Sequence, residues 1–431
     1  MRYSFAALLA VTPSLALAAE PAPPPPASVD APAVVAPQVV APPPGVPAPT
    51  AAAPKEPAWY ERVRVGAFVD AYYAHSWKAP KPSRTPATFR AFDQYKGFNV
   101  AWLGIDTALD PDPVGFVGQV RFGSATPNLA LADATGEAAG LAVVQQAYAA
   151  YRPGGPDGKL TLIFGKFDTV YGHEVPQSHL NINYTRGAMF NLGQPFFHTG
   201  FRADYLATKE LTLKFLLVNG WNNSIDNNSG KSAGLSIAFV PSERVAVTVG
   251  YLGGPEQTDT VQTPADPTTT PPTPASTTAV KGANGRMRHL ADVVVDLRPV
   301  DPLRVVMNGT YVTEKIVHAD DTKHTASWYG GALLARVGLG EKLGVAARGE
   351  YFVDAKHGLP TGGLFVGADG NPKKGTIMTG TLTLEALPTK NLLVRLENRL
   401  DHASEKVFAD GLTGTTKQQV TTTLGVVVKT D

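Results

Sequence analysis

The sequence predicts an all-β fold, a transmembrane antiparallel β-barrel of about sixteen strands that follows an N-terminal signal peptide and a Pro-rich linker. Three observations support it. Segments of about ten residues alternate apolar and polar side chains, short turns alternate with long loops, and aromatic residues fall at both ends of the apolar faces. The predicted division is 1–19 for the signal peptide, 20–57 for the linker and 58–431 for the barrel.

Residues 1–19 have the order of a secretory signal. Arg2 gives a positive start, a short apolar stretch follows, and Ala16-Leu17-Ala18 has the small-x-small pattern of a cleavage site. The stretch is shorter than the ~20 apolar residues of a membrane-spanning helix. We expect the signal to be cleaved and the mature chain to leave the cytoplasm.

The next segment, 20–57, holds 14 of the 37 prolines. Proline removes a backbone donor and fixes φ, so this segment cannot join a ladder of strands. We expect an extended, disordered linker in the periplasm. Two interpretations stay open, a passive spacer and a tether that contacts peptidoglycan.

Beyond the linker, apolar and polar residues alternate with the period of a β-strand. In 391–403, for example, Leu396 and Leu400 share one face, and Arg395, Glu397 and Arg399 share the other. The predicted strands are 62–75, 98–109, 114–123, 141–152, 158–166, 197–207, 210–221, 231–240, 244–253, 287–298, 303–314, 326–337, 343–354, 376–387, 391–403 and 417–429.

The connections between these strands are alternately short and long. Every second one is a tight turn rich in Pro, Gly, Asp or Ser, such as 110–113 and 299–302, and the others are longer and polar. This is the pattern of bacterial outer-membrane barrels, which have short periplasmic turns and long external loops. Closure of the barrel leaves no unpaired strand edge in lipid.

Aromatic residues separate a membrane barrel from a soluble sandwich. They share the apolar face and flank a Val, Leu and Ala band at both ends, as the aromatic girdles of outer-membrane barrels do. The residues at the long-loop ends are Tyr73, Phe122, Tyr251, Tyr311 and Tyr351, and those at the short-turn ends are Tyr151, Tyr205 and Phe239.

The opposite face of the strands is charged and predicts a lumen. Sixteen strands are wide enough to leave an aqueous channel, which solvates charges that a dry core would have to pair. Both signs occur, and pairing across strands is the simpler role for any one of them. The predicted pore-lining residues are Asp70, Asp106, Arg121, Arg202, Lys214, Arg336, Arg348, Glu350, Arg395, Glu397, Arg399 and Asp401.

The long connection 167–196 is the candidate constriction. It combines apolar side chains, which can pack against a wall, with the polar residues Asp168, His173, Glu174, His179 and Arg186. In general porins of the same strand number the third long loop folds into the lumen. We expect this loop to do so and to face wall arginines such as Arg348 and Arg395 across the opening. A cap folded over the outside is the alternative.

Several motifs resemble a family of known fold. They include Gly66-Ala67-Phe68-Val69-Asp70, Gly165-Lys166-Phe167-Asp168-Thr169, Pro195-Phe196-Phe197-His198 and Val218-Asn219-Gly220-Trp221-Asn222. Their order resembles the putative β-barrel porin-2 family of bacterial outer-membrane proteins, most closely over 60–240. The resemblance implies an outer-membrane pore and supplies no catalytic residues.

Catalytic and metal-binding motifs are weak. The segment Gly230-Lys231-Ser232-Ala233-Gly234 has the spacing of a nucleophile elbow. However, it follows an Asn-rich loop and precedes residues that alternate with the period of a strand, whereas an elbow joins a strand to a helix. Oxygen atoms in 222–228 could hold calcium, although a polar loop tip explains them as well. We predict no enzyme activity, no cofactor and no resident metal.

The expected function is passive diffusion of small hydrophilic solutes or ions across the outer membrane. A structural or adhesive barrel with a closed lumen is the alternative, and a barrel-borne hydrolase is a weaker one. The formal charge of +1 gives no footprint for nucleic acid. Expected partners are membrane lipid and the solutes, with a homotrimer and peptidoglycan contact as further possibilities.

Overall fold

A computed structural model describes residues 58–78, 90–93, 96–133, 140–258, 260–263, 276–279, 285–317, 323–356, 364–367, 370–411 and 413–430. The signal peptide 1–19 and the whole of the linker 20–57 therefore lie outside the described residues, and both stay predictions. No described helix is long and apolar enough to cross a membrane.

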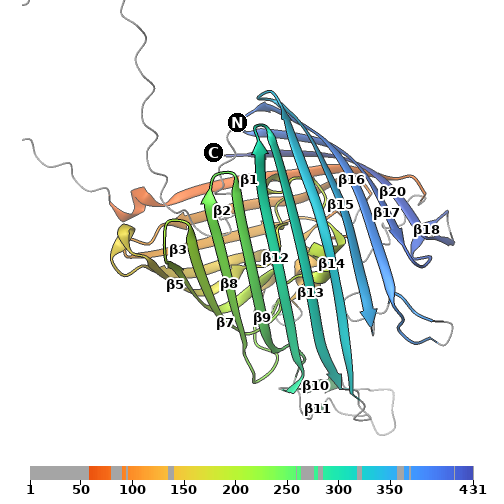
Figure 1. The fold of residues 1–431 in the computed structure, drawn as a ribbon, viewed down its shortest axis with the longest axis horizontal. Coiled ribbons are helices and arrows are strands. Elements are labelled where there is room, and N and C mark those ends of the chain that lie inside the picture. Colours follow the sequence, from red (N-terminus) through yellow and green to blue (C-terminus); the bar gives the residue numbers. More distant parts are fainter. Residues whose placement is uncertain are drawn as a thin grey trace, which may run out of the picture.

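Sixteen antiparallel strands close into one barrel, in which β1 pairs with β2 and with the last strand, β20 (Figure 1). The strands of the barrel are β1 (Arg64–Ser76), β2 (Gly97–Leu109), β3 (Val114–Phe122), β4 (Val144–Tyr151), β5 (Leu160–Asp168), β6 (Phe197–Leu206), β7 (Leu211–Val218), β8 (Ser232–Ser242), β9 (Val245–Pro255), β12 (Met287–Val300), β13 (Leu303–Val317), β14 (Lys323–Leu339), β15 (Leu343–Lys356), β16 (Gly375–Thr389), β17 (Leu392–Ala403) and β20 (Gln418–Lys429). The predicted fold class is confirmed, and each predicted strand overlaps one of these.

The long connections carry short elements that the sequence analysis did not foresee. Helix α2 (Thr126–Ala132) follows β3, and two small hairpins stand apart from the barrel sheet. These hairpins are β10 (Thr260–Thr263) with β11 (Ser276–Ala279), and β18 (Phe408–Asp410) with β19 (Gly414–Thr416). They are too short to produce a clear period in the sequence.

Alternation along the strands separates an exposed outer face from a buried inner face. In β17, Leu396 and Leu400 are more than two-fifths exposed, whereas Arg395, Glu397 and Arg399 are buried. Most of the predicted girdle residues lie on the outer face: the side chains of Phe122, Tyr151, Tyr205, Phe239, Tyr251, Tyr311 and Tyr351 are 44–52% exposed. An exposed apolar band bounded by aromatic residues is what lipid requires.

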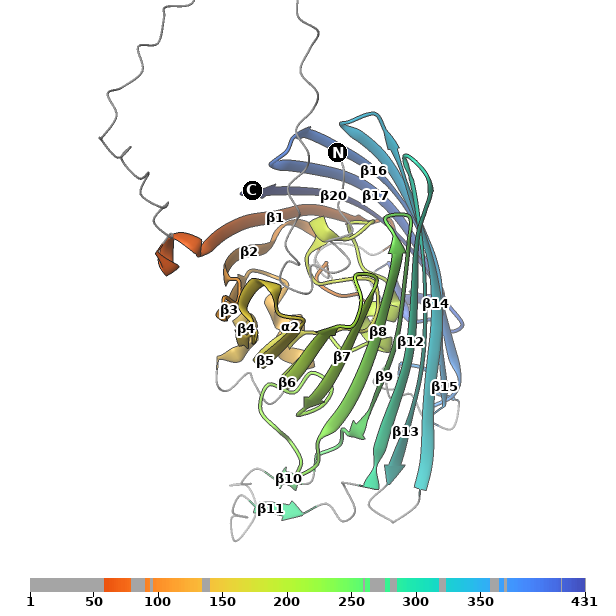
Figure 2. The same ribbon diagram turned by 60° about the vertical axis from the view of Figure 1, so that its left-hand side comes forward.

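The wall of the barrel is uneven in height. Strands β3 to β7 have 8–10 residues, whereas β12 to β16 have 14–17. The figures show the long strands reaching beyond their neighbours on the side away from the start of β1 and the end of β20 (Figures 1 and 2). That side carries the long loops, and the short turns lie at the end where β1 starts.

Candidate functional site

The connection 167–196 folds into the barrel and packs against its inner wall. Its neck is closed by Thr169, whose N–H donates to the carbonyl of Phe196 at 3.0 Å. Just before it, the carboxylate of Asp168 accepts hydrogen bonds from Gln145 on β4 at 2.9 and 3.1 Å. Both ends of the loop are therefore held at the wall.

Two tyrosines of the loop lie over glycines of the wall. Tyr171 covers Gly250 on β9, where an added Cβ would lie 2.6 Å from the ring. Tyr184 covers Gly425 on β20, where a Cβ would lie 2.2 Å from the ring. Both rings are 1% exposed. The absence of side chains at these wall positions is therefore a requirement for docking of the loop.

Strand β17 binds the backbone of the loop at two charged residues. The Glu397 carboxylate accepts from the N–H groups of Tyr184 at 2.7 Å and Thr185 at 3.1 Å. The Arg395 guanidinium donates to the carbonyls of Ser178 at 2.7 Å and Asn181 at 2.8 Å. Charge-assisted hydrogen bonds of this kind are stronger than neutral ones, so they fix the loop firmly.

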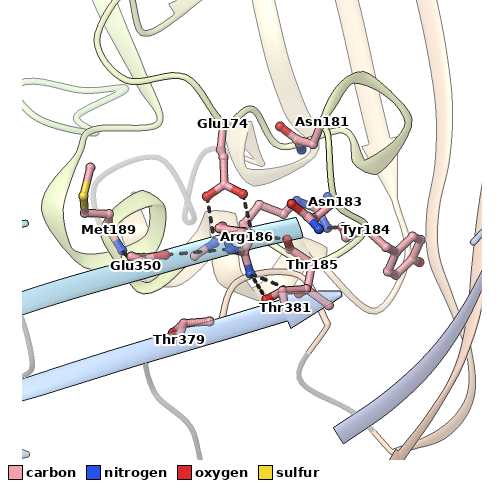
Figure 3. A network of polar contacts seen from close by, with 12 residues as sticks. Glu174, Asn181, Asn183, Tyr184, Thr185, Arg186, Met189, Glu350, Thr379 and Thr381 are labelled. Atoms are coloured by element: carbon pink, nitrogen blue, oxygen red, sulfur yellow. Dashed lines mark hydrogen bonds and ion pairs between the residues drawn. The ribbon is translucent and has the colours of Figure 1, made fainter. Parts of the chain in front are cut away.

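An ion pair fastens the loop to β15, and Figure 3 shows the network of polar contacts around it. The Arg348 guanidinium lies 2.6 Å from one oxygen of Glu174 and also donates to the carbonyl of Thr185 at 2.5 Å. The other oxygen of Glu174 accepts from the N–H of Gly187 at 2.7 Å. The expectation that Glu174 faces Arg348 across an opening is wrong, because the two side chains are in direct contact.

Two further contacts of the loop lie on β12 and β1, on either side of β15 and β17 in the strand order. Asp292 on β12 accepts from the N–H of Gly172 at 2.8 Å, and Asp70 on β1 accepts from the hydroxyl of Tyr184 at 2.6 Å. Because the loop starts at β5 and β6, its contacts to β1, β12, β15 and β17 place it across the lumen. An external cap, the alternative for this segment, does not fit these contacts.

Two histidines of the loop are held neutral. Burial, together with the nearby Arg304, lowers the pKa of His173 to about 3. Burial, together with Lys429 and arginines such as Arg395, lowers the pKa of His179 to about 3. The remaining charged residue, Arg186, is 1% exposed and donates to the carbonyl of Tyr184 at 3.2 Å. None of the three is presented to open solvent as a free charge.

A second segment reaches the loop and was missed by the sequence analysis. Arg90 donates to Thr421 on β20 at 2.9 Å and lies 3.4 Å from Asp401. The ring of Phe92 packs between Trp102 of the wall and Phe190 of the loop, with centroids 5.2 and 6.0 Å away. The signal in the sequence was an Arg, a Phe and an Asp close together in a connection that otherwise reads as polar.

All the predicted pore-lining residues lie on the inner face, but most are enclosed. Those that are buried are Asp70, Arg121, Arg202, Lys214, Arg348, Glu350, Arg395, Glu397, Arg399 and Asp401. Asp106 and Arg336 keep more exposure, with side chains 36% and 17% exposed. Their role as lining of a conducting path stays a prediction.

The hydrolase motif does not form an elbow. Ser232 is the first residue of β8, and its hydroxyl donates to Glu256 at 2.6 Å. Burial raises the pKa of Glu256 to about 7. The two ring nitrogens of His198 are hydrogen-bonded, Nε2 to the Thr169 hydroxyl at 3.1 Å and Nδ1 to the Gly220 carbonyl at 3.0 Å. Among the described residues, no group of three or more His, Asp or Glu is arranged to hold a metal.

The family model described as "Putative beta-barrel porin-2, OmpL-like" matches residues 62–429. The chain belongs to this family. Membership accounts for the closed sixteen-strand barrel and for its place in the bacterial outer membrane, and the resemblance seen in the sequence over 60–240 extends over the whole barrel. No curated protein matches the chain.

Solved structures of outer-membrane proteins share the fold of this porin-2 family member. OprB of Pseudomonas putida aligns with a TM-score of 0.53 at 12% identity, covering 86% of this chain and 95% of that one. The outer-membrane channel DcaP of Acinetobacter baumannii gives 0.52 at 11% identity, covering 85% and 97%. OmpT of Vibrio cholerae, in a trimer form, gives 0.51 at 13% identity, covering 85% and 99%. At such low identity the likeness is one of fold.

Proposed function

We propose that the barrel is a passive diffusion porin for small hydrophilic solutes and that the loop 167–196 is its constriction. The observation that carries the proposal is that this loop, whose ends join β5 and β6, is fastened to the opposite arc of the wall through Asp292 on β12, Arg348 on β15 and Glu397 on β17. A loop held in this way narrows the lumen. No catalytic step is required.

Shortening the loop tests the constriction. A deletion within 175–194 leaves the neck contact between Thr169 and Phe196 in place, so β5 and β6 stay joined. Water would then solvate Arg348, Arg395 and Glu397, and the narrowest cross-section would widen. Single-channel conductance in planar bilayers should rise relative to the full-length protein. A folded deletion variant with unchanged conductance would contradict the role of the loop.

A structural or adhesive barrel is the second candidate, and one observation favours it. Inner-face arginines such as Arg348, Arg399 and Arg202 are at most 2% exposed, which is the burial expected of a plugged lumen. The same bilayer measurement separates the two functions, because a plugged barrel gives no conductance steps at high protein load. Ester turnover abolished by Ser232→Ala would instead support the hydrolase.

Export of the chain, the place of its linker and its assembly are part of the same proposal. The signal peptide directs export and is cleaved, and the linker 20–57 lies in the periplasm, where contact with peptidoglycan is one role for it. A homotrimer is a further possibility, since one structure of similar fold is described as a trimer form. Cross-linking of the folded protein in outer-membrane fragments would give the number of copies.

A further inference from the structure

Two arginines on neighbouring strands lie side by side on the inner face, near the short-turn ends. Arg304, close to the start of β13, is paired in register with Arg336, close to the end of β14. Like charges directly opposite each other destabilise a sheet. The barrel therefore keeps an unfavourable pair of like charges here, and neighbouring carboxylates compensate for it.

Each arginine is held by a buried carboxylate. Arg304 lies 2.7 Å from Asp296 on β12, and Arg336 donates to Glu385 at 3.1 Å. Glu385 is on β16, so the Arg336 side chain has to pass over β15. It passes at Gly344, where an added Cβ would lie 3.0 Å from Arg336 Nη2 and 3.3 Å from the Glu385 carboxylate. The glycine thus permits a contact that positions Arg336.

The two arginines are more exposed than the three wall arginines that bind the loop. The side chains of Arg304 and Arg336 are 16% and 17% exposed, whereas Asp296 and Glu385 are 1% and 2% exposed. The Arg348, Arg395 and Arg399 side chains are 0–4% exposed and donate to carbonyls of the loop. Arg288, equally exposed at 16%, lies near the long-loop end of β12 and pairs with Glu314. At the short-turn ends of β13 and β14, the positive charge presented to the lumen therefore comes from Arg304 and Arg336.

A third arginine meets one of the two carboxylates. Arg395 shares Glu385 with Arg336, at 2.7 Å, so three guanidiniums contact the buried carboxylates Asp296 and Glu385. Arg298 also lies near Arg304, and the carboxylates near it are Asp296, Asp301 and Glu243. On the loop side of Arg304, both ring nitrogens of His173 are buried and make no hydrogen bond.

We propose that Arg304 and Arg336 form a subsite for small oxyanions, carboxylates or inorganic phosphate, on the short-turn side of the loop. An oxyanion between two guanidiniums relieves their repulsion and accepts charge-assisted hydrogen bonds from both. The ring of His173 can donate a further hydrogen bond. The inference deepens the proposed function, because it makes the pore prefer anions and names the class of solute it takes.

The test uses the full-length protein in planar bilayers. The reversal potential is measured in a KCl gradient, and the single-channel current is measured while phosphate or succinate replaces chloride at equal ionic strength. Arg336→Gln is the main variant, because Glu385 keeps Arg395 as its partner. The double variant Arg304→Gln with Asp296→Asn removes the other arginine without leaving a buried carboxylate unpaired. Lys209→Gln, in the exposed turn after β6, is the matched control for the change in charge.

The wild-type pore should prefer anions, and phosphate and succinate should reduce the current by occupying the subsite. Arg336→Gln should weaken this block by about tenfold, the order expected for loss of a charge-assisted hydrogen bond, and move the reversal potential toward cations. Lys209→Gln should leave both unchanged. Block by only one of the two anions would identify the source of the oxyanion. A cation-preferring wild type, or equal block in wild type and Arg336→Gln, would overturn the subsite.

A wild-type protein without conductance would contradict the proposed function and not the subsite. The subsite is then tested by the unfolding midpoint of the detergent-folded barrel, because a ligand that binds only the folded state raises it. Phosphate should raise the midpoint of the wild type more than that of Arg336→Gln. Equal shifts would overturn the subsite in that case as well.

Discussion

Arg348 and Glu174 show how charges are kept inside this barrel. Their side chains are 0% and 7% exposed, and the pair is completed by the Thr185 carbonyl and the Gly187 N–H. Breaking a buried pair by removing one partner costs about 3–5 kcal/mol, because the remaining charge is left unpaired. These residues therefore act first on the position of the loop, and any effect on solutes follows from that position.

On the outer face, a single charge should be poorly tolerated. Leu396 is 41% exposed on the lipid side of β17. An arginine near the bilayer midplane costs about 2–4 kcal/mol in an outer-membrane barrel, so Leu396→Arg should lower the free energy of unfolding in vesicles by that order. Leu396→Met is the control, since it keeps the apolar character and nearly the volume. Equal unfolding midpoints for the two variants would show that this face does not contact lipid.

The direction of a side chain was predictable from the sequence, but its partner was not. Period-two alternation placed Arg395 and Glu397 inside and Leu396 outside, because alternate side chains of a strand point to opposite faces. The contact of Glu397 with Tyr184 joins residues 213 positions apart. No local pattern encodes such a pairing, so the predicted opening between loop and wall arginines was wrong in detail.

At the scale of elements, the loop 167–196 packs against the wall where glycines leave room for its tyrosine rings. Strands were predictable because their period is regular, whereas the segment 90–93 has no period and was missed. The fit of Tyr184 over Gly425 likewise depends on a strand more than 200 residues later in the chain. The candidate site was therefore predictable as a loop, and its contacts were not.

Substitution of Gly425 should displace the loop. An alanine would place Cβ 2.2 Å from the Tyr184 ring, and relief of such overpacking typically costs about 1–3 kcal/mol. Gly425→Ala should expose the loop to trypsin at Arg186, which is 1% exposed when the loop is docked. The further change Tyr184→Ala removes the clash, and Gly349→Ala, where open space surrounds the added Cβ, is the control. Resistance to trypsin in Gly425→Ala would contradict the fit.

At the scale of the whole molecule, the barrel is complete without the N-terminal segment. Strand β1 begins at Arg64 and pairs with both β2 and β20, so the ladder closes with residues that follow the linker. The sequence predicted this division because proline cannot take part in the ladder. The uneven height of the wall was not predictable, since strand ends depend on pairing with neighbours.

Removal of 20–57 should leave a functional barrel. A signal peptide joined directly to Trp59 should give a protein that inserts and conducts as the full-length protein does, because no strand is lost. Heat-modifiable mobility on gels reports folding, and bilayer conductance reports the pore. A variant that is exported but never acquires the folded mobility would show that the linker takes part in assembly.

The closure of the barrel by β1 and β20 also orders the steps of folding. Tyr184 is bound by Asp70, 114 positions earlier, and by Glu397, 213 positions later. Contacts between such distant residues form late, since they require long chain segments to be ordered first. The loop can dock fully only after the first and last strands have met. Pulsed hydrogen exchange should therefore show protection of the amides of β13 and β14 before those of Tyr184 and Thr185. In this order of events, the state that precedes the native one is a wider cylinder without a constriction.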